Sequence, residues 1–461
     1  MPRKLFLNTG ICKCHLLTII FNTLLLVFFF IHPAHLHSED ILQDEAKMDT
    51  ELDYNGELLQ DDSDIDTFKI RGYYKNLFIY TGTDSYLKTW DSLPEKKSLI
   101  SDLNRIRISP FFQPSANFFI QADIDNEYMA SNYGESITFD ETWRIDDYND
   151  LLPYAWQPYE SGNHYYRLKI NRAFAKWTLN RFTFTFGRQL VRFGSGRLWN
   201  PLDILNPLSP TNVEGADEQK GIDALRIEFY PTFRSEISMV YSPQYEDDSC
   251  EKDNWKFGND NFVCRYRNSF GDTDLALLAG RVVLRSAYGA DLATIIFDGM
   301  LHGSFLYTVP DRGDVYFMAN AGYEYTFASG IYLLIEHFYN GNSLNSNDEL
   351  MAAWTEQKLH GTSQQTYEML SRQFITLNEH YTGCELSKDI TPLIKASCYF
   401  IIDYQGSTVL LSPAVTWNPL EDLELSGGIM CASGMDDDSE ESDFSELEKY
   451  PYMYASLKWH F

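Results

Sequence analysis

Charged side chains recur at every second position in several segments of this chain, and such sets could attract or select a charged solute. Residues two apart in a strand point to the same face, so Arg105 and Arg107 share a face opposite Ile106. Unpaired cations on neighbouring strands would attract anions, whereas cations paired with interleaved acids would only brace the wall, and the sequence leaves both interpretations open. The candidates are Lys69, Arg71, Lys75, Arg105, Arg107, Asp123, Asp125, Arg167, Lys169, Arg226, Glu228, Arg234 and Glu236.

A second candidate is the stretch 186–207, which is rich in Gly, Pro, Arg and Asn. The alternation that precedes it would place Arg188 on an apolar face, which predicts a β-bulge at Gly187. Beyond this point two glycines and two Asn-Pro pairs break the strand. A loop of this length either folds inward as a constriction that carries Arg197, or packs outside as an external loop.

The spacing of serine, histidine and cysteine residues gives little support for a catalytic or metal-binding site. Ser195 lies in a Gly-Ser-Gly run without the spacing or the strand-turn-helix context of a hydrolase nucleophile. The histidines lack metal-ligand spacing, and no CxxC pair occurs. We expect no catalytic, metal or cofactor site, with a hydrolase built on one rim of the fold as a minor alternative.

The negative net charge of the chain limits the kinds of molecule that it can bind. The net charge is −29, and it becomes −32 without the first 38 residues, which hold three basic residues and no acidic ones. Nucleic-acid binding needs a basic face, so no nucleic-acid partner is expected. Five cysteines follow residue 38, and Cys250 could pair with Cys264, and Cys384 with Cys398, in an oxidising compartment.

The segment 451–461 shows which kind of element must position these side chains. Apolar residues alternate strictly with polar and tyrosine residues up to Phe461, which predicts a strand with one apolar and one wet face. The closing strand of a bacterial outer-membrane β-barrel has this pattern, which would place Trp459 and Phe461 in lipid. Similar alternation predicts eighteen strands, with sixteen as the alternative count, at 67–81, 101–111, 115–130, 164–178, 181–194, 222–231, 233–243, 261–270, 274–284, 287–297, 300–309, 313–327, 331–341, 374–388, 393–404, 408–418, 422–433 and 451–461.

The connectors favour a transmembrane barrel independently of the alternation. Those after even-numbered strands are short, such as 179–180, whereas the long ones, such as 131–163, follow odd-numbered strands. Outer-membrane barrels have short periplasmic turns and long external loops, and a β-propeller shows no such segregation. We predict an all-β transmembrane antiparallel barrel, in which Glu324, Glu336 and Glu424 face inward opposite the basic strands.

The N-terminus predicts export. Three basic residues precede an apolar run at 16–31, which is too short for a dependable membrane span and fits a signal peptide. The chain is therefore divided into a cleaved signal peptide at 1–38, an acidic flexible segment at 39–66 and a barrel at 67–461, with an uncleaved anchor as the alternative. Export through the periplasm would lead to the outer membrane of a Gram-negative bacterium.

Three stretches resemble uncharacterised porin-like proteins of Gram-negative bacteria. They are Gly-Arg-Gln at 187–189, Gly-Ser-Gly-Arg-Leu-Trp-Asn-Pro-Leu-Asp at 194–203 and Gly-Ile-Asp-Ala-Leu-Arg at 221–226. The eighteen-strand layout is similar, more loosely, to alginate-export-type barrels. The resemblance implies a substrate-conducting or export barrel with Arg188, Arg197 and Arg226 at the lumen or mouth. The chain departs from a strongly basic alginate conduit at Asp123, Asp125, Glu228 and Glu236.

Together these patterns predict an outer-membrane channel for passive passage or export of small or anionic hydrophilic solutes. The alternative is a non-conducting surface barrel with an adhesive or structural role. The expected partners are outer-membrane lipid, lipopolysaccharide and the solute, and the expected assembly is a homotrimer or a monomer.

Overall fold

The computed structural model describes residues 68–83, 98–134, 155–206, 219, 221–243, 260–311, 313–344, 346, 373–434 and 441–461, without the side chains of 157–161. The chain divides into two compact units, and these residues all belong to the second, Thr50–Phe461. The predicted signal peptide and acidic segment lie outside the described residues.

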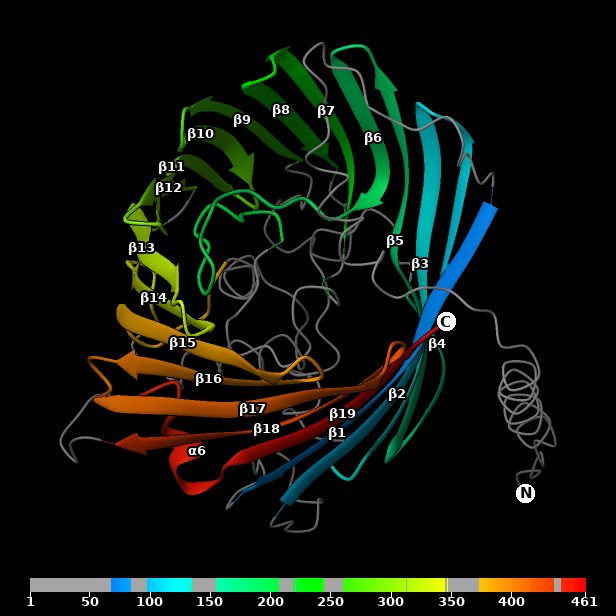
Figure 1. The fold of residues 1–461 in the computed structure, drawn as a ribbon, viewed down its shortest axis with the longest axis vertical. Helices are drawn as coiled ribbons and strands as arrows, with labels where there is room; N and C mark the ends of the chain where they lie inside the picture. The colour runs from blue at the N-terminus through cyan, green and yellow to red at the C-terminus, as the bar shows by residue number, and fades with distance from the viewer. Residues whose placement is uncertain are drawn as a thin grey trace, which may run out of the picture. The chain divides into compact units, whose positions relative to one another are not determined.

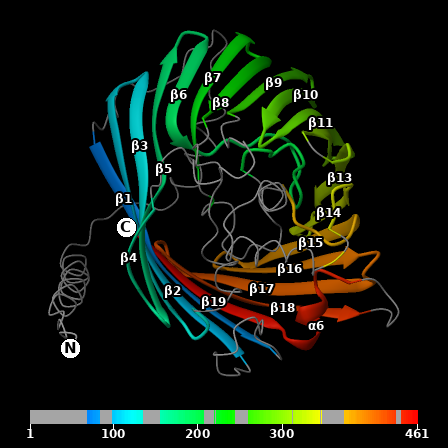
Figure 2. The same cartoon turned by 180° about the vertical axis from the view of Figure 1, so that it is seen from behind.

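The described strands form one antiparallel sheet that closes on itself (Figures 1 and 2). Eighteen strands make the ring, in the order β1, β2, β3 and then β5 to β19, and β19 pairs with β1. A closed ring leaves no sheet edge with unpaired backbone groups, as a membrane-spanning sheet requires. The predicted eighteen-strand barrel is confirmed. The strands are β1 Phe68–Gly82, β2 Ser98–Ser115, β3 Phe118–Ser131, β4 Ala155–Ser161, β5 His164–Leu179, β6 Phe182–Gln189, β7 Ile222–Thr232, β8 Ser235–Ser242, β9 Asn261–Phe270, β10 Thr273–Val282, β11 Arg285–Ile296, β12 Gly299–Pro310, β13 Tyr316–Thr326, β14 Ile331–Asn340, β15 His380–Thr391, β16 Ile394–Asp403, β17 Thr408–Leu420, β18 Leu423–Gly434 and β19 Tyr452–His460.

The C-terminal strand closes the ring, as its alternation predicts. Gly72 and Phe461 exchange two backbone hydrogen bonds, at 2.9 and 3.0 Å, just beyond the ladder between β1 and β19. Trp459 lies opposite Tyr74, on the face that points away from the buried Tyr73. The aromatic end of the chain therefore belongs to the wall of the barrel.

β4 lies inside a segment that the alternation assigns to a connector. It pairs with residues 164–169 of β5, whereas β6 pairs with β5 only along 173–179. β4 therefore occupies the length of β5 that β6 leaves unpaired. Its sequence, Ala-Trp-Gln-Pro-Tyr-Glu-Ser, contains a proline and no strict alternation, so the strand pattern does not reveal it.

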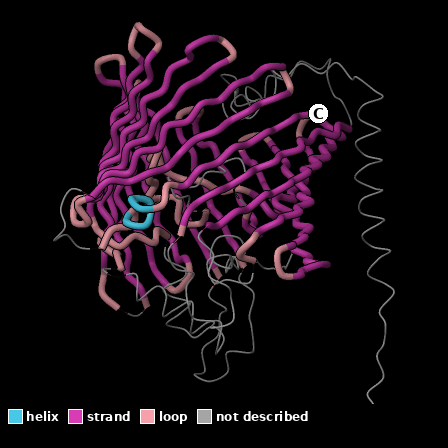
Figure 3. Tube along the Cα trace, turned by 90° about the horizontal axis from the view of Figure 1, so that it is seen from below, coloured by secondary structure: helices cyan, strands magenta, loops and turns pink. Residues whose placement is uncertain are grey.

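The two ends of the barrel differ in their connections (Figure 3). Two-residue turns join β2 to β3, β5 to β6, β7 to β8, β9 to β10, β11 to β12, β15 to β16 and β17 to β18, at the end where β19 finishes. Longer connections, such as 190–221 and 341–379, join strands at the opposite end, which also has two-residue turns at 162–163 and 283–284. The predicted long connections therefore all lie at one end of the barrel, but short turns occur at both ends.

A short helix, α6 (Ser445–Lys449), precedes β19 at the end with the long connections. In the part of the chain that the structure describes, no helix is long and apolar enough to cross a membrane.

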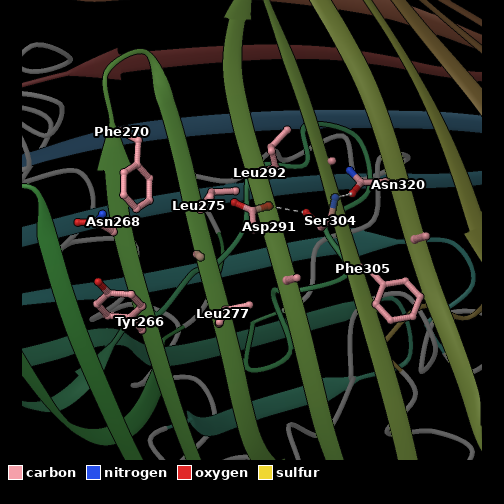
Figure 4. A pocket seen from close by; sticks show the side chains of 14 residues that line it. Tyr266, Asn268, Phe270, Leu275, Leu277, Asp291, Leu292, Ser304, Phe305 and Asn320 are labelled. Carbon is pink, nitrogen blue, oxygen red and sulfur yellow. Dashed lines mark hydrogen bonds between the residues drawn. The ribbon is translucent and has the colours of Figure 1, made fainter.

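The two faces of the wall carry different side chains. Leu277, Tyr288 and Phe305 point outward from β10 to β12 and are exposed. Asp291 and Ser304 lie on the opposite face of the same strands, where they share a hydrogen bond (Figure 4). A barrel in a bilayer needs an apolar outer face and tolerates polar groups inside.

Apolar side chains also pack inside the barrel, near the end with the long connections. Phe193 and Leu202, which follow β6, cluster with the inward Val263 of β9. A second cluster joins Trp199 to Phe338 of β14. The segment after β6 is therefore packed against the inner wall on two sides.

Candidate functional site

Residues 190–206, called the inner segment below, leave the end of β6 and run inside the ring of strands (Figures 1 and 2). Asp291 on β11 accepts hydrogen bonds from the backbone N–H of Ser195 at 3.0 Å and from its hydroxyl at 2.8 Å. The same carboxylate accepts a bond from the Ser304 hydroxyl at 2.7 Å. Up to residue 206 this loop therefore runs inward, whereas residues 207–218 of the predicted loop at 195–221 lie outside the described residues.

Glu336 on β14 holds three consecutive residues of the inner segment, 197–199. Its carboxylate accepts hydrogen bonds from the backbone N–H groups of Arg197 at 2.9 Å, Leu198 at 3.2 Å and Trp199 at 2.7 Å. His302 Nε2 on β12 lies 2.8 Å from the same carboxylate, and both side chains are 0% exposed. A buried carboxylate is tolerated where donors surround it, so Glu336 fixes the inner segment to the wall.

Trp199 is the main apolar anchor of the inner segment. Its ring stacks on Phe338 with centroids 5.4 Å apart and an angle of 6° between the planes. Its carbonyl accepts a bond from Asn320 at 2.9 Å, and Gln373 donates to the carbonyl of Pro201 at 2.7 Å. Arg197 reaches away from this anchor and pairs with Glu324 at 2.9 Å in a half-exposed position. Polar and apolar contacts thus fix the same stretch.

Asp203 is a buried acid within the inner segment. It is 1% exposed, and the guanidinium of Arg192 lies 3.5 Å from its carboxylate. Burial raises the pKa of the Asp203 carboxyl well above its usual range, and attraction to Arg192 offsets only part of this effect. The inner segment therefore carries a group that protonates more readily than an ordinary aspartate.

The basic residues predicted on β2 and β5 form one network with acids of β3. Arg107 donates to Asp125 at 2.6 and 2.8 Å, and Arg105 lies 2.7 Å from Glu127. Both carboxylates are buried, at 0% and 2% exposure. Arg105 also lies 3.8 Å from Asp125. The contacts from β5 are Arg167 to Glu127 at 2.5 Å, Lys169 to Glu127 at 3.0 Å and Lys169 to Asp125 at 3.9 Å.

This network joins four cations to two carboxylates. Its cations are paired, as the bracing interpretation requires. Glu127 is a member that the candidate list omits, although it continues the two-residue spacing of Asp123 and Asp125. Asp123 itself accepts a bond from Ser109 at 2.7 Å.

Arg188 is buried and pairs with Asp223 on β7 at 2.9 Å. The bulge predicted at Gly187 is not found, because the register of β6 against both neighbours runs through this residue without a shift. Gly187 instead adopts a φ of 116°, which a glycine tolerates without an added residue. The register shift in this region lies on β5, at Asn171.

The remaining candidates occupy several places on the wall. Arg226 pairs with Glu228 at 2.6 Å on β7, and Glu236 on β8 lies 3.7 Å from Arg265 of β9. Arg234 lies in the turn between β7 and β8, exposed, with its guanidinium over the ring of Phe233. The three candidates on β1 share the face of the buried Tyr73, namely Lys69, Arg71 and Lys75.

The described cysteines are free thiols. Cys384 is in register with Phe400, and Cys398 with Leu386, so the two thiols are offset along neighbouring strands. The suggested pairing of these cysteines is therefore wrong, and Cys264 is also unpaired by a disulfide. Cys250 lies outside the described residues. Within the described ranges, no group of three or more His, Cys, Asp or Glu side chains could hold a metal ion.

No protein-family model matches the chain, and no curated protein matches it. Among solved structures, engineered variants of the porin from Rhodopseudomonas blastica are similar to it, with TM-scores of 0.41 to 0.42 and identities of 12% to 13%. The matches cover 86% of this chain and 100% of each porin chain. Similarity at this level does not assign a family or a solute to this chain.

Proposed function

We propose that the protein is an outer-membrane channel through which small hydrophilic solutes pass passively, and that the inner segment narrows the path. The closed barrel, its apolar outer face and its charged inner face support this function. The observation that carries the proposal is the attachment of the inner segment to the inner wall by Asp291 and Glu336. A segment held this way reduces the cross-section and leaves the barrel wall intact.

The solute preference proposed here is weakly anionic. The described ion pairs of the network on β2, β3 and β5 contain four basic side chains and two carboxylates, and basic side chains along neighbouring strands favour anions near that part of the wall. Two inward acids limit this preference, Glu324 on β13 and Glu424 on β18, which is separated from β2 only by β19 and β1. Small neutral and anionic solutes are therefore the expected cargo.

We propose further that the protein lies in the outer membrane of a Gram-negative bacterium. An apolar outer face fits the lipid and lipopolysaccharide of that membrane, which the chain would reach after removal of the signal peptide. We propose no catalytic activity, because Ser195 uses its hydroxyl to hold Asp291 and the sequence around it lacks the pattern of a hydrolase nucleophile.

A second candidate function is a non-conducting surface barrel. The observation that favours it is the pair of apolar clusters inside the barrel, which bury Phe193, Leu202, Trp199 and Phe338 against the wall. Buried apolar side chains in contact exclude water locally, as in a protein interior.

Liposome swelling distinguishes the two functions. Liposomes that contain the purified full-length protein are placed in isotonic solutions of a neutral pentose or of a small carboxylate. A channel makes them swell faster than protein-free liposomes, with a rate that falls as the solute grows. Swelling no faster than in protein-free liposomes, for the wild type and for Glu336→Gln alike, would contradict the channel and favour the surface barrel.

A further inference from the structure

The outer wall carries a group of polar residues at a place where the neighbouring wall is apolar. The outer polar patch consists of Tyr74 and Asn76 on β1 with Asp102 and Asn104 on β2. These residues alternate with the buried, inward-facing Lys75, Leu77, Leu103 and Arg105, so they share the outward face. The strands that carry the patch lie beside β19 and β3 in the ring (Figure 1).

The members of the outer polar patch bind one another. Tyr74 donates its hydroxyl to the Asn104 side-chain oxygen at 2.6 Å, and Asn76 donates to Asp102 at 2.6 Å and to Asn104 at 3.2 Å. The amide of Asn104 lies 3.5 Å from the second oxygen of Asp102. A carboxylate offers about four acceptor positions, so Asp102 retains capacity for further donors.

Apolar residues surround the patch along both strands. Phe78 and Tyr80 follow it on β1, opposite Asp102 and Ile100 of β2, and Ile106 lies on its other side, opposite Tyr74. On β19 the residue opposite Asn76 is Leu457. The patch therefore lies within the apolar belt and not at its edge.

We propose that the outer polar patch is an interface with a second copy of this chain. The proposal rests on the outer face meeting lipid, as the proposed function requires. Hydrocarbon offers no hydrogen bonds, and ionisable residues at membrane depth are costly unless a protein partner covers them. A second patch supplies what this one lacks, because the Asn104 amide, which makes a single contact at 3.5 Å within its own patch, can donate its other N–H to an open position of Asp102. Symmetric contacts between identical patches of this kind are typical of homo-oligomers.

Two measurements on the full-length protein test this interface. The first is the oligomeric state in mild detergent, by native mass spectrometry and by gel electrophoresis of unheated samples. We expect an oligomer for the wild type and a fall of about tenfold in its fraction for the combined variant Asn76→Leu, Asp102→Leu and Asn104→Leu. The matched control is Asn268→Leu with Thr382→Leu, which also removes polar groups from the outward face, on β9 and β15, and it should leave the fraction unchanged.

The second measurement does not depend on the stability of a variant barrel. A photo-crosslinking residue in place of Asn126, which neighbours the patch on β3, should produce a crosslinked dimer in intact cells, whereas one in place of Leu277 should not. A wild-type monomer in detergent, or crosslinks from position 126 only to lipopolysaccharide or to another protein, would overturn the proposal. Because each copy is a complete barrel, loss of the oligomer leaves the swelling assay positive, so failure of the interface and failure of the channel are distinguishable.

Discussion

Glu336 shows how a single buried carboxylate can organise a segment that has no secondary structure of its own. It takes three backbone N–H groups of the inner segment and one contact from His302. Removal of an acceptor at such a place leaves several donors buried without a partner, and each costs about 1–3 kcal/mol.

Glu336→Gln should therefore lower the free energy of unfolding by about 2–4 kcal/mol, because the amide keeps one acceptor oxygen and turns a donor toward the N–H groups. Urea unfolding of the protein in lipid vesicles measures this change. The matched control is Glu424→Gln, an inward acid on β18 in register with Lys458, which should cost less than about 1 kcal/mol. Equal effects of the two variants would show that Glu336 does not hold the inner segment.

Arg107 and Asp125 provide a second test at single residues. Arg107→Ala leaves Asp125 buried with only the more distant Arg105 and Lys169, at 3.8 and 3.9 Å. We expect a loss of about 2–4 kcal/mol, with part of it recovered when Asp125→Ala is added, because the uncompensated charge is then gone. The exposed Arg234→Ala should change stability by less than about 0.5 kcal/mol. A double variant that is as unstable as the sum of its parts would contradict the pairing.

At the scale of elements, the alternation of apolar and polar residues predicts the strands of the barrel wall, but it does not predict the segment that packs inside the barrel. Lipid on one face and a polar interior on the other impose a period of two on each strand, so all eighteen ring strands are recognisable in the sequence. The strand ends are less regular, since β15 starts at His380 and not at residue 374. β4 is not predicted, because its sequence contains a proline and does not alternate strictly.

The attachment of the inner segment could not be predicted from the sequence. Glu336 binds backbone groups that lie 137 to 139 residues away, and backbone donors carry no residue-type signal. The space for the segment depends on Gly289 and Gly383, where an added Cβ would collide with Leu202 and Leu198 respectively. Such contacts can be recognised only when the positions of both the glycine and the leucine are known.

Asp203 makes the stability of the inner segment depend on pH. Its pKa is raised by burial, so the folded state binds a proton more readily than the unfolded state. Its unfavourable contribution is therefore absent below the unfolded pKa near 4 and grows as pH rises through the folded value. Asp203→Asn should melt at a higher temperature than the wild type at pH 8, with the difference closing toward pH 4. A variant that is less stable at pH 8, by a margin that widens with pH, would show that the ion pair with Arg192 outweighs the burial.

At the scale of the whole molecule, the two faces of each strand have different surroundings. The outward face is largely apolar, and the proposed interface would cover the outer polar patch on β1 and β2. The interior combines a paired charge network on one side with a packed segment on the other. A channel in such a barrel has to run beside the inner segment, along the half-exposed inward residues of the later strands, such as Tyr399 and Ser456.

Single-channel recording in a planar lipid bilayer tests the central claim most directly, because it reports an open path and its width together. The wild-type protein should produce discrete conductance steps of uniform size. Glu336→Gln should produce larger and noisier steps, because the inner segment is released from the wall, and Glu424→Gln should match the wild-type step size. Absence of steps in all three proteins, or identical steps in all three, would contradict a channel that is narrowed by residues 190–206.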